Sequence, residues 1–89
     1  MCYNKIVEIG RFTGFITMDN AYSTTEIGRR IKQKRLEIKY TREKLANAAC
    51  ISDKFLYDIE VGNKGMSAET LLNISKALDI SADWILNGD

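Results

Sequence analysis

The chain has 89 residues, a formal net charge of +1 at pH 7 and no proline, and 45% of its residues are hydrophobic. A chain of this length forms one domain with a modest core, which leaves little room for a deep catalytic cleft. It contains no apolar run of about 18 residues, so the sequence predicts no membrane span.

Enzymatic and metal-binding functions lack their usual residues in this chain. The sequence contains no histidine and only two cysteines, Cys2 and Cys50, which excludes a histidine-based triad and a structural zinc site. It contains no phosphate-binding glycine motif, and its carboxylates form no pattern that favours acid–base catalysis. We therefore expect a cytoplasmic protein that is not an enzyme, needs no cofactor or metal, and keeps both cysteines as reduced thiols.

The first residues differ in composition from the rest of the chain. Residues 1–17 (MCYNKIVEIGRFTGFIT) are rich in β-branched and aromatic side chains. Two short strands would be marginally stable on their own, so we interpret residues 1–20 as a tail or arm and residues 21–89 as the folded domain. The apolar stretch at residues 6–16 is a candidate dimer surface.

The first helix is predicted to begin at Ser23. Ser23 and Glu26 form an S-x-x-E capping box, in which the side chains satisfy free backbone N–H groups at the helix start. The apolar residues that recur at helical spacing, and so predict its buried face, are Ile27, Ile31 and Ile38. A break is expected at residues 39–40.

Two short helices follow, capped by Thr41 and Ser52, whose side chains can accept hydrogen bonds from N–H groups of the first turn. Gly62 is expected to end the second of them. The residues predicted to face inward are Leu45, Ala46 and Ala49 in the first and Phe55, Leu56 and Ile59 in the second.

Two more helices complete an all-α arrangement of five. Ser67 is predicted to cap the fourth helix, and the residues of its predicted apolar face are Leu71, Leu72, Ile74 and Leu78. Ser81 caps a short fifth helix, which residues 87–88 end. Its apolar residues, Trp84, Ile85 and Leu86, either close the core or also form a dimer contact.

Positive charge is concentrated in one part of the sequence. Residues 28–44 contain eight Lys and Arg residues against two Glu, a net charge of +6, whereas residues 45–89 carry a net charge of −4. A basic stripe on a balanced protein is typical of a surface that attracts phosphates. An ordinary solvated helix face has the same composition, so the charge pattern alone does not decide between them.

The stretch from Thr41 to Gly62 (TREKLANAACISDKFLYDIEVG) contains two short capped helices joined by a turn. This layout places one helix across the backbone of a duplex and the next in the major groove, where exposed side chains reach base edges. Two short helices and a turn also occur in helical bundles that bind no DNA.

Several motifs resemble, in order and spacing, the helix-turn-helix family of the phage lambda repressor and Cro (Xre-type). They are K-Q-K-R at 32–35, T-R-E-K-L-A at 41–46, I-S at 51–52, I-E-V-G at 59–62, L-L-N-I-S-K-A-L at 71–78 and D-W-I-L-N-G at 83–88. The resemblance covers residues 27–86. It implies a five-helix lambda-repressor-like domain whose second and third helices form the helix-turn-helix of a transcriptional regulator.

The resemblance also implies roles for individual residues. Arg35 and Glu60 occupy the positions of a structural ion pair. The positions expected to contact DNA phosphates are Thr41, Arg42, Lys44, Gly62, Asn63 and Lys64. The positions expected to face the groove and read bases are Ser52, Asp53, Lys54, Tyr57 and Asp58, on a recognition helix at residues 52–61.

Two departures from the family pattern leave alternatives open. Asp53 and Asp58 either accept hydrogen bonds from cytosine N4 or weaken DNA binding in a copy of the fold that recognises protein; Lys54 is the better candidate for a guanine contact. Cys50 replaces the glycine usual at the turn, so it either accepts backbone strain or the turn has another shape.

The expected ligand is double-stranded DNA, bound by a homodimer without a cofactor. A twofold dimer places two recognition helices about 34 Å apart, one turn of DNA, and binding should weaken with salt because bound cations on DNA are released. The alternative is a DNA-inert adaptor, or an antitoxin-like protein, that binds another protein.

Overall fold

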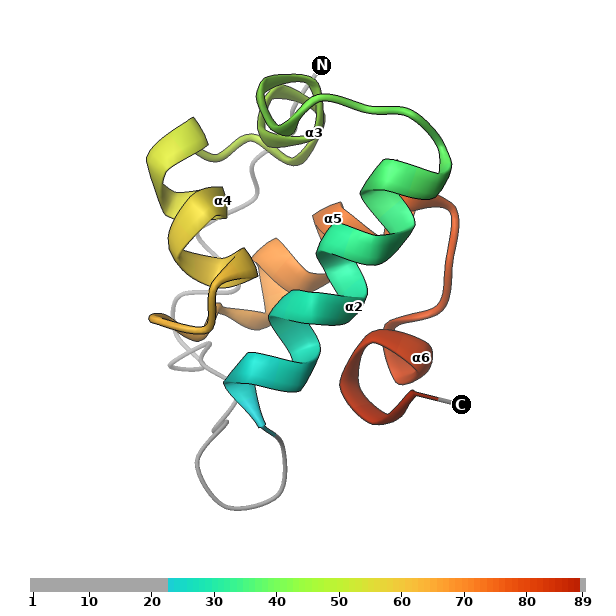
Figure 1. Ribbon diagram of the computed structural model, residues 1–89. Helices are drawn as coiled ribbons and strands as arrows, with labels where there is room; N and C mark the ends of the chain where they lie inside the picture. The colour runs from blue at the N-terminus through green and yellow to red at the C-terminus, as the bar shows by residue number, and fades with distance from the viewer. Residues whose placement is uncertain (1–22, 89) are drawn as a thin grey trace.

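The computed structural model describes residues 23–88, which form five α-helices joined by short turns (Figure 1). Their bounds are α2 Thr24–Glu37, α3 Arg42–Ala49, α4 Asp53–Glu60, α5 Ala68–Leu78 and α6 Ala82–Asn87. The long α2 runs diagonally across the domain in front of α5, with α3 and α4 on one side and α6 on the other. The all-α, five-helix prediction is confirmed.

Every predicted helix start is confirmed by a side-chain cap. Ser23, Thr41, Ser52, Ser67 and Ser81 each accept a hydrogen bond from the backbone N–H three residues further on. The N···O distances lie between 3.0 and 3.2 Å. Because each cap satisfies a donor that has no partner inside its helix, these local signals set where the helices begin.

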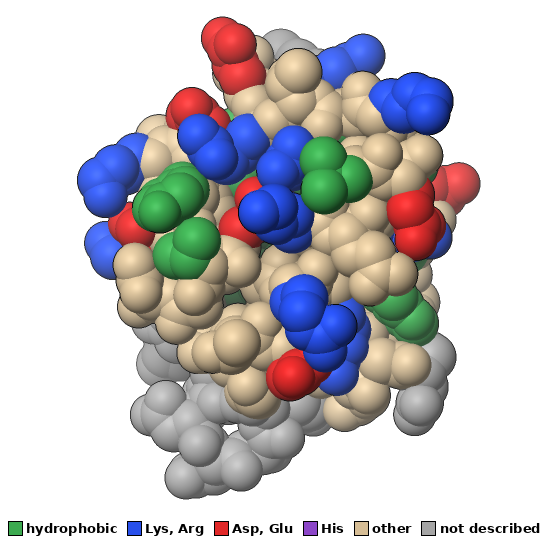
Figure 2. Space-filling view, viewed as in Figure 1, with side chains coloured by type: hydrophobic (Ala, Val, Ile, Leu, Met, Phe, Trp, Pro, Cys, Tyr) green, Lys and Arg blue, Asp and Glu red, His purple; other side chains and the backbone are tan. Residues whose placement is uncertain are grey.

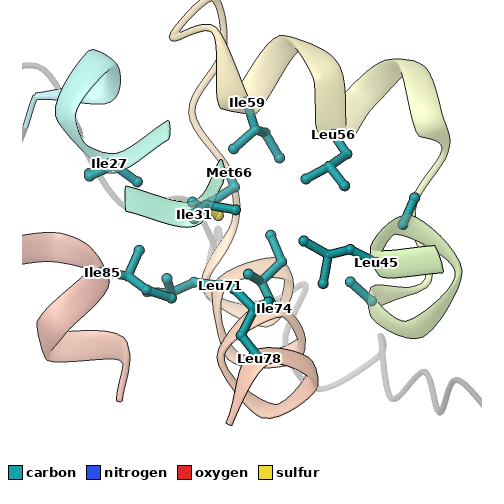
Figure 3. Packing of buried hydrophobic residues seen from close by; sticks show 12 residues of the cluster. Ile27, Ile31, Leu45, Leu56, Ile59, Met66, Leu71, Ile74, Leu78 and Ile85 are labelled. Carbon is teal, nitrogen blue, oxygen red and sulfur yellow. The ribbon is translucent and has the colours of Figure 1, made fainter. Parts of the chain in front are cut away.

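Side chains from all five helices meet in one core (Figure 3). Met66, from the loop between α4 and α5, also points into it and was not anticipated from the sequence. The buried apolar residues are Ile27, Ile31, Leu45, Ala46, Ala49, Leu56, Ile59, Met66, Leu71, Ile74, Leu78 and Ile85. Trp84 and Leu86 are half-buried against this core, which favours the core-closing interpretation of α6.

Two predicted core residues are exposed. Ile38 is 37% exposed because α2 ends at Glu37, so the helical spacing no longer applies to it. Arg35 takes the next buried place after Ile27 and Ile31. Leu72 is 51% exposed, since it follows the buried Leu71 directly and therefore lies about 100° further round α5.

The turns on either side of α3 use a left-handed backbone. Lys39 has φ 62° and Cys50 has φ 64°, so Cys50 accepts the conformation that usually favours glycine. The expectation that both cysteines are reduced thiols involves Cys2, which lies outside the described residues.

The close approach of α2 and α4 requires a residue without a side chain. A Cβ atom on Gly28 would lie 2.6 Å from the backbone oxygen of Glu60 and closer still to that of Ile59. The two helix backbones therefore almost touch at Gly28, which holds α4 at a fixed position against α2.

No helix in residues 23–88 is long and apolar enough to cross a membrane. The predicted arm at residues 1–20, and the dimer surface expected at residues 6–16, lie outside the described part of the chain.

Candidate nucleic-acid interface

The outer edge of α4 presents four polar or aromatic side chains to solvent. Leu56 and Ile59 anchor the opposite face of this helix in the core. The exposed residues at and after its start are Ser52, Asp53, Lys54 and Tyr57. Four of the five predicted base-reading positions therefore share one accessible edge beside α3.

Asp58 does not belong to that edge, and the expectation that it faces outward is wrong. Its side chain is only 9% exposed, and one carboxylate oxygen lies 3.4 Å from Nζ of Lys54 and 3.9 Å from Nζ of Lys64. Position 58 lies between the exposed Tyr57 and the buried Ile59, so the helix turns it toward the protein. Its charge is offset by these two lysines.

Arg42 and Asp53 join the first turns of α3 and α4. Nε of Arg42 donates to Oδ1 of Asp53 at 2.9 Å. The guanidinium carbon lies 5.1 Å from the centre of the Tyr57 ring, within cation–π range. The hydrogen bond to Asp53 raises the pKa of Arg42 above its already high ordinary value, so this group stays charged.

The start of α3 offers further polar groups to an anion. The Thr41 hydroxyl accepts from the backbone N–H of Lys44 at 3.0 Å, so it is engaged as the helix cap. The Lys44 side chain is exposed and its Nζ lies 4.7 Å from the centre of the Tyr40 ring. Thr41 and Lys44 are thus accessible at the end of α3 that carries the positive pole of the helix dipole.

The loop after α4 is tied to the protein by its backbone. The N–H of Gly62 donates to the carbonyl of Ile59 at 3.1 Å, so this amide is already engaged within the protein and the phosphate contact expected at Gly62 does not have it free. The Gly62 carbonyl accepts from the Thr24 hydroxyl at 3.1 Å, and φ of Gly62 is 87°. Asn63 and Lys64 remain exposed beyond it.

The ion pair expected between Arg35 and Glu60 is present. Nε and Nη2 of Arg35 donate to the two oxygens of Glu60 at 2.7 and 3.0 Å. Nη1 donates to the carbonyl of Tyr40 at 3.0 Å. All three guanidinium nitrogens of Arg35 therefore donate within the protein, and the residue adds nothing to an outer cationic surface.

Much of the basic stripe at residues 28–44 is engaged in contacts within the domain. Arg30 donates to the carbonyls of Ile85 and Leu86 at 2.9 and 3.1 Å. Lys34 pairs with Glu37 at 3.0 Å, and Arg29 pairs with Glu26. Figure 2 accordingly shows blue and red side chains interspersed over this face, with green patches between them.

The described residues contain no group of three His, Cys, Asp or Glu side chains placed to hold a metal ion.

A family model described as "Helix-turn-helix domain" matches residues 28–89. The chain belongs to this helix-turn-helix family. Its resemblance to the lambda repressor/Cro (Xre-type) group is confirmed by relatives of that kind.

Three relatives of this helix-turn-helix chain illustrate the likeness. The HTH-type transcriptional regulator DicA of Escherichia coli (strain K12) is 38% identical over 63 residues, which are 71% of this chain and 47% of DicA. The chain thus spans about half the length of that relative.

Two relatives have been solved with DNA. The P22 c2 repressor, in complex with a synthetic operator, is 32% identical, with a TM-score of 0.69 over 71% of this chain and 96% of the repressor. SinR, a protein of Bacillus subtilis, is 35% identical in its DNA complex, with a TM-score of 0.64 over 66% of this chain and 95% of that one. SinR has also been solved with the SinI protein.

Besides the burial of Met66, sequence reasoning missed two further features of this helix-turn-helix domain. The bond of Arg30 to the end of α6 joins residues 55 positions apart, and no local pattern signals it. Gly28, by contrast, left a visible signal, because glycine inside a helix is unfavourable unless a backbone passes close to it.

Proposed function

We propose that this chain is a regulator of transcription that binds specific sequences of double-stranded DNA, with α4 in the major groove. The observation that carries the proposal is the exposed edge of α4, formed by Ser52, Asp53, Lys54 and Tyr57 beside the charged Arg42. The major groove admits one α-helix, and side chains near its N-terminus reach base edges. Membership of the helix-turn-helix family and the relatives solved with DNA support DNA binding as the function.

Phosphate contacts would flank that edge on both sides. Thr41 and Lys44 lie at the start of α3, and Asn63 and Lys64 lie in the loop after α4. A helix N-terminus and exposed lysines hold phosphate oxygens without regard to sequence, and they fix the register of the reading helix. We therefore assign positioning to these four residues and base reading to the exposed edge of α4.

We propose that Lys54, at the exposed start of α4, contacts a base directly. Its side chain is 79% exposed and its Nζ is held only loosely by Asp58, at 3.4 Å. A lysine ammonium can donate to O6 and N7 of guanine. Replacing Lys54 by Ala should change the preferred base at one position of each half-site, not merely weaken binding.

The proposed binding unit is a homodimer. One domain of this size reads only a few base pairs, whereas a twofold dimer engages two half-sites about 34 Å apart. Sedimentation of the free protein and of its complex with duplex DNA measures this directly. One chain per duplex at saturation would contradict the dimer.

A titration with labelled duplex DNA from upstream of its own gene, at two salt concentrations, tests the function. We expect saturable binding that weakens steeply as salt rises, because Lys and Arg displace counterions from DNA. A scrambled duplex of equal composition is the matched control and should bind more weakly. If the protein bound both duplexes equally, its binding would not depend on DNA sequence and the proposed specificity would be wrong.

Protein recognition is the second candidate function. It is favoured by the pairing of Arg42 with Asp53, and of Lys54 and Lys64 with Asp58, which lowers the positive potential of the edge. An adaptor or antitoxin-like protein would give no DNA complex at low salt and would co-purify with a protein partner. That pair of results would replace the DNA-binding proposal.

A further inference from the structure

The guanidinium of Arg42 lies over α4, although Arg42 itself begins α3. Nε of Arg42 donates a hydrogen bond to Asp53, and its guanidinium faces the ring of Tyr57. Asp53 and Tyr57 are four residues apart on α4. Residues at this spacing share one face of a helix. Asp53 and Tyr57 are both exposed. The guanidinium of Arg42 therefore reaches across the turn onto the outer edge of α4.

We propose that Arg42 reads a guanine in the major groove and that Asp53 is the residue that positions it. This inference rests on the proposed DNA-binding function; within it, Arg42 becomes a reader and Asp53 changes from a reader to a positioning residue. The family resemblance implies a phosphate contact for Arg42, whereas its contacts here place its charge among the base-reading side chains.

The hydrogen-bonding geometry of Arg42 supports this role. Asp53 engages Nε, so the two Nη groups at the other end of the guanidinium form a fork that can donate to O6 and N7 of guanine. The carboxylate and the Tyr57 ring together fix the plane of the guanidinium. An arginine held in this way loses less conformational freedom when it binds a base.

The same arrangement accounts for an acidic residue at the start of a reading helix. An isolated carboxylate beside phosphates is unfavourable. Paired with Arg42 at 2.9 Å, Asp53 makes a nearly neutral unit whose outer end is a set of N–H donors. The carboxylate also lies in the first turn of α4, where the helix dipole favours negative charge.

The test compares variants by selection from a library of random-sequence duplexes, followed by titration at several salt concentrations. Arg42→Lys keeps the charge but removes the planar fork. We expect it to lose preference for guanine at one position of each half-site by roughly 5- to 100-fold, the discrimination typical of one bidentate contact. Its salt dependence should match that of the parent, because the charge is unchanged.

Asp53→Asn separates a positioning role from a merely structural one. Loss of the carboxylate frees the guanidinium, so preference for the same guanine should fall several-fold. Binding to scrambled DNA should rise, since one negative charge has left the interface. A structural role for Asp53 would instead lower both, together with the thermal stability of the protein.

Lys76→Ala is the matched control, because it removes an exposed cation from α5 and leaves the side chains of α3 and α4 unchanged. It should leave base preference unchanged. If Arg42→Lys retains the guanine preference of the parent, or weakens all sequences equally, Arg42 is a phosphate contact and this inference fails while the proposed function stands. If the parent itself selects no sequence, both fail.

Discussion

Arg35 and Glu60 form a two-point ion pair that joins the last turn of α2 to the end of α4, with N···O distances of 2.7 and 3.0 Å. Their side chains are only 8% and 3% exposed. The third contact of Arg35, to the carbonyl of Tyr40, adds the turn before α3. One guanidinium thus connects α4, and the turn that leads into α3, to α2.

Removal of one partner of this pair should be costly. Arg35→Ala leaves the Glu60 carboxylate buried without its cation, so we expect the free energy of unfolding to fall by about 3–5 kcal/mol. Urea unfolding followed by circular dichroism measures this change. Lys32→Ala, an exposed change on the same helix, should stay within about 0.5 kcal/mol of the parent. A loss below about 1 kcal/mol for Arg35→Ala would show that the pair is not a brace.

Gly28→Ala should destabilise the protein even though alanine favours helix by about 1 kcal/mol over glycine. The new methyl group would meet the backbone oxygens of Ile59 and Glu60. Because both obstacles are backbone atoms, α4 must shift, and overpacking of this kind costs about 1–3 kcal/mol. The midpoint of thermal unfolding should fall by several degrees, and DNA affinity should fall with it. An unchanged or higher midpoint would refute the close contact.

Lys39→Gly should stabilise the protein modestly. Lys39 has φ 62°, a conformation that costs a residue with a Cβ about 1–2 kcal/mol. Glycine removes this cost, but it also gives the unfolded chain more conformational freedom, which offsets part of the benefit. The free energy of unfolding should therefore rise by about 0.5–1 kcal/mol. Lys39→Ala removes the same charge without relieving the backbone, so it isolates the conformational effect. Equal unfolding midpoints for the two variants would contradict the prediction.

Asp58→Asn should strengthen binding to DNA. The change frees Lys54 and Lys64, which now share one carboxylate oxygen. A partly exposed ion pair is worth about 0–1 kcal/mol, so releasing the two lysines should raise the affinity for DNA about two- to fivefold. Asp79→Asn removes the same charge at the end of α5 and controls for overall charge. The assignment of the two lysines fails if both variants bind DNA equally.

The predictions that held depend on neighbours in sequence. An N-cap hydroxyl needs as its partner only the backbone N–H three residues further on, so Ser23, Thr41 and Ser52 marked helix starts correctly. Leu45, Ala46 and Ala49 likewise share a helix face by their spacing alone. Leu72 was misplaced because an apolar residue at the margin of such a face is buried only if another helix covers it.

The sequence by itself determined the number of helices, their starts and most of the core, because caps and helical spacing act over three or four residues. Only the tertiary structure decided which charges remain free at the α3–α4 edge. The partners of Arg42 and Arg35 lie 11 and 25 residues away, and the fold alone brings them within hydrogen-bonding distance. Charge counted along a chain does not reveal such pairing, since it depends on how α2, α3 and α4 pack.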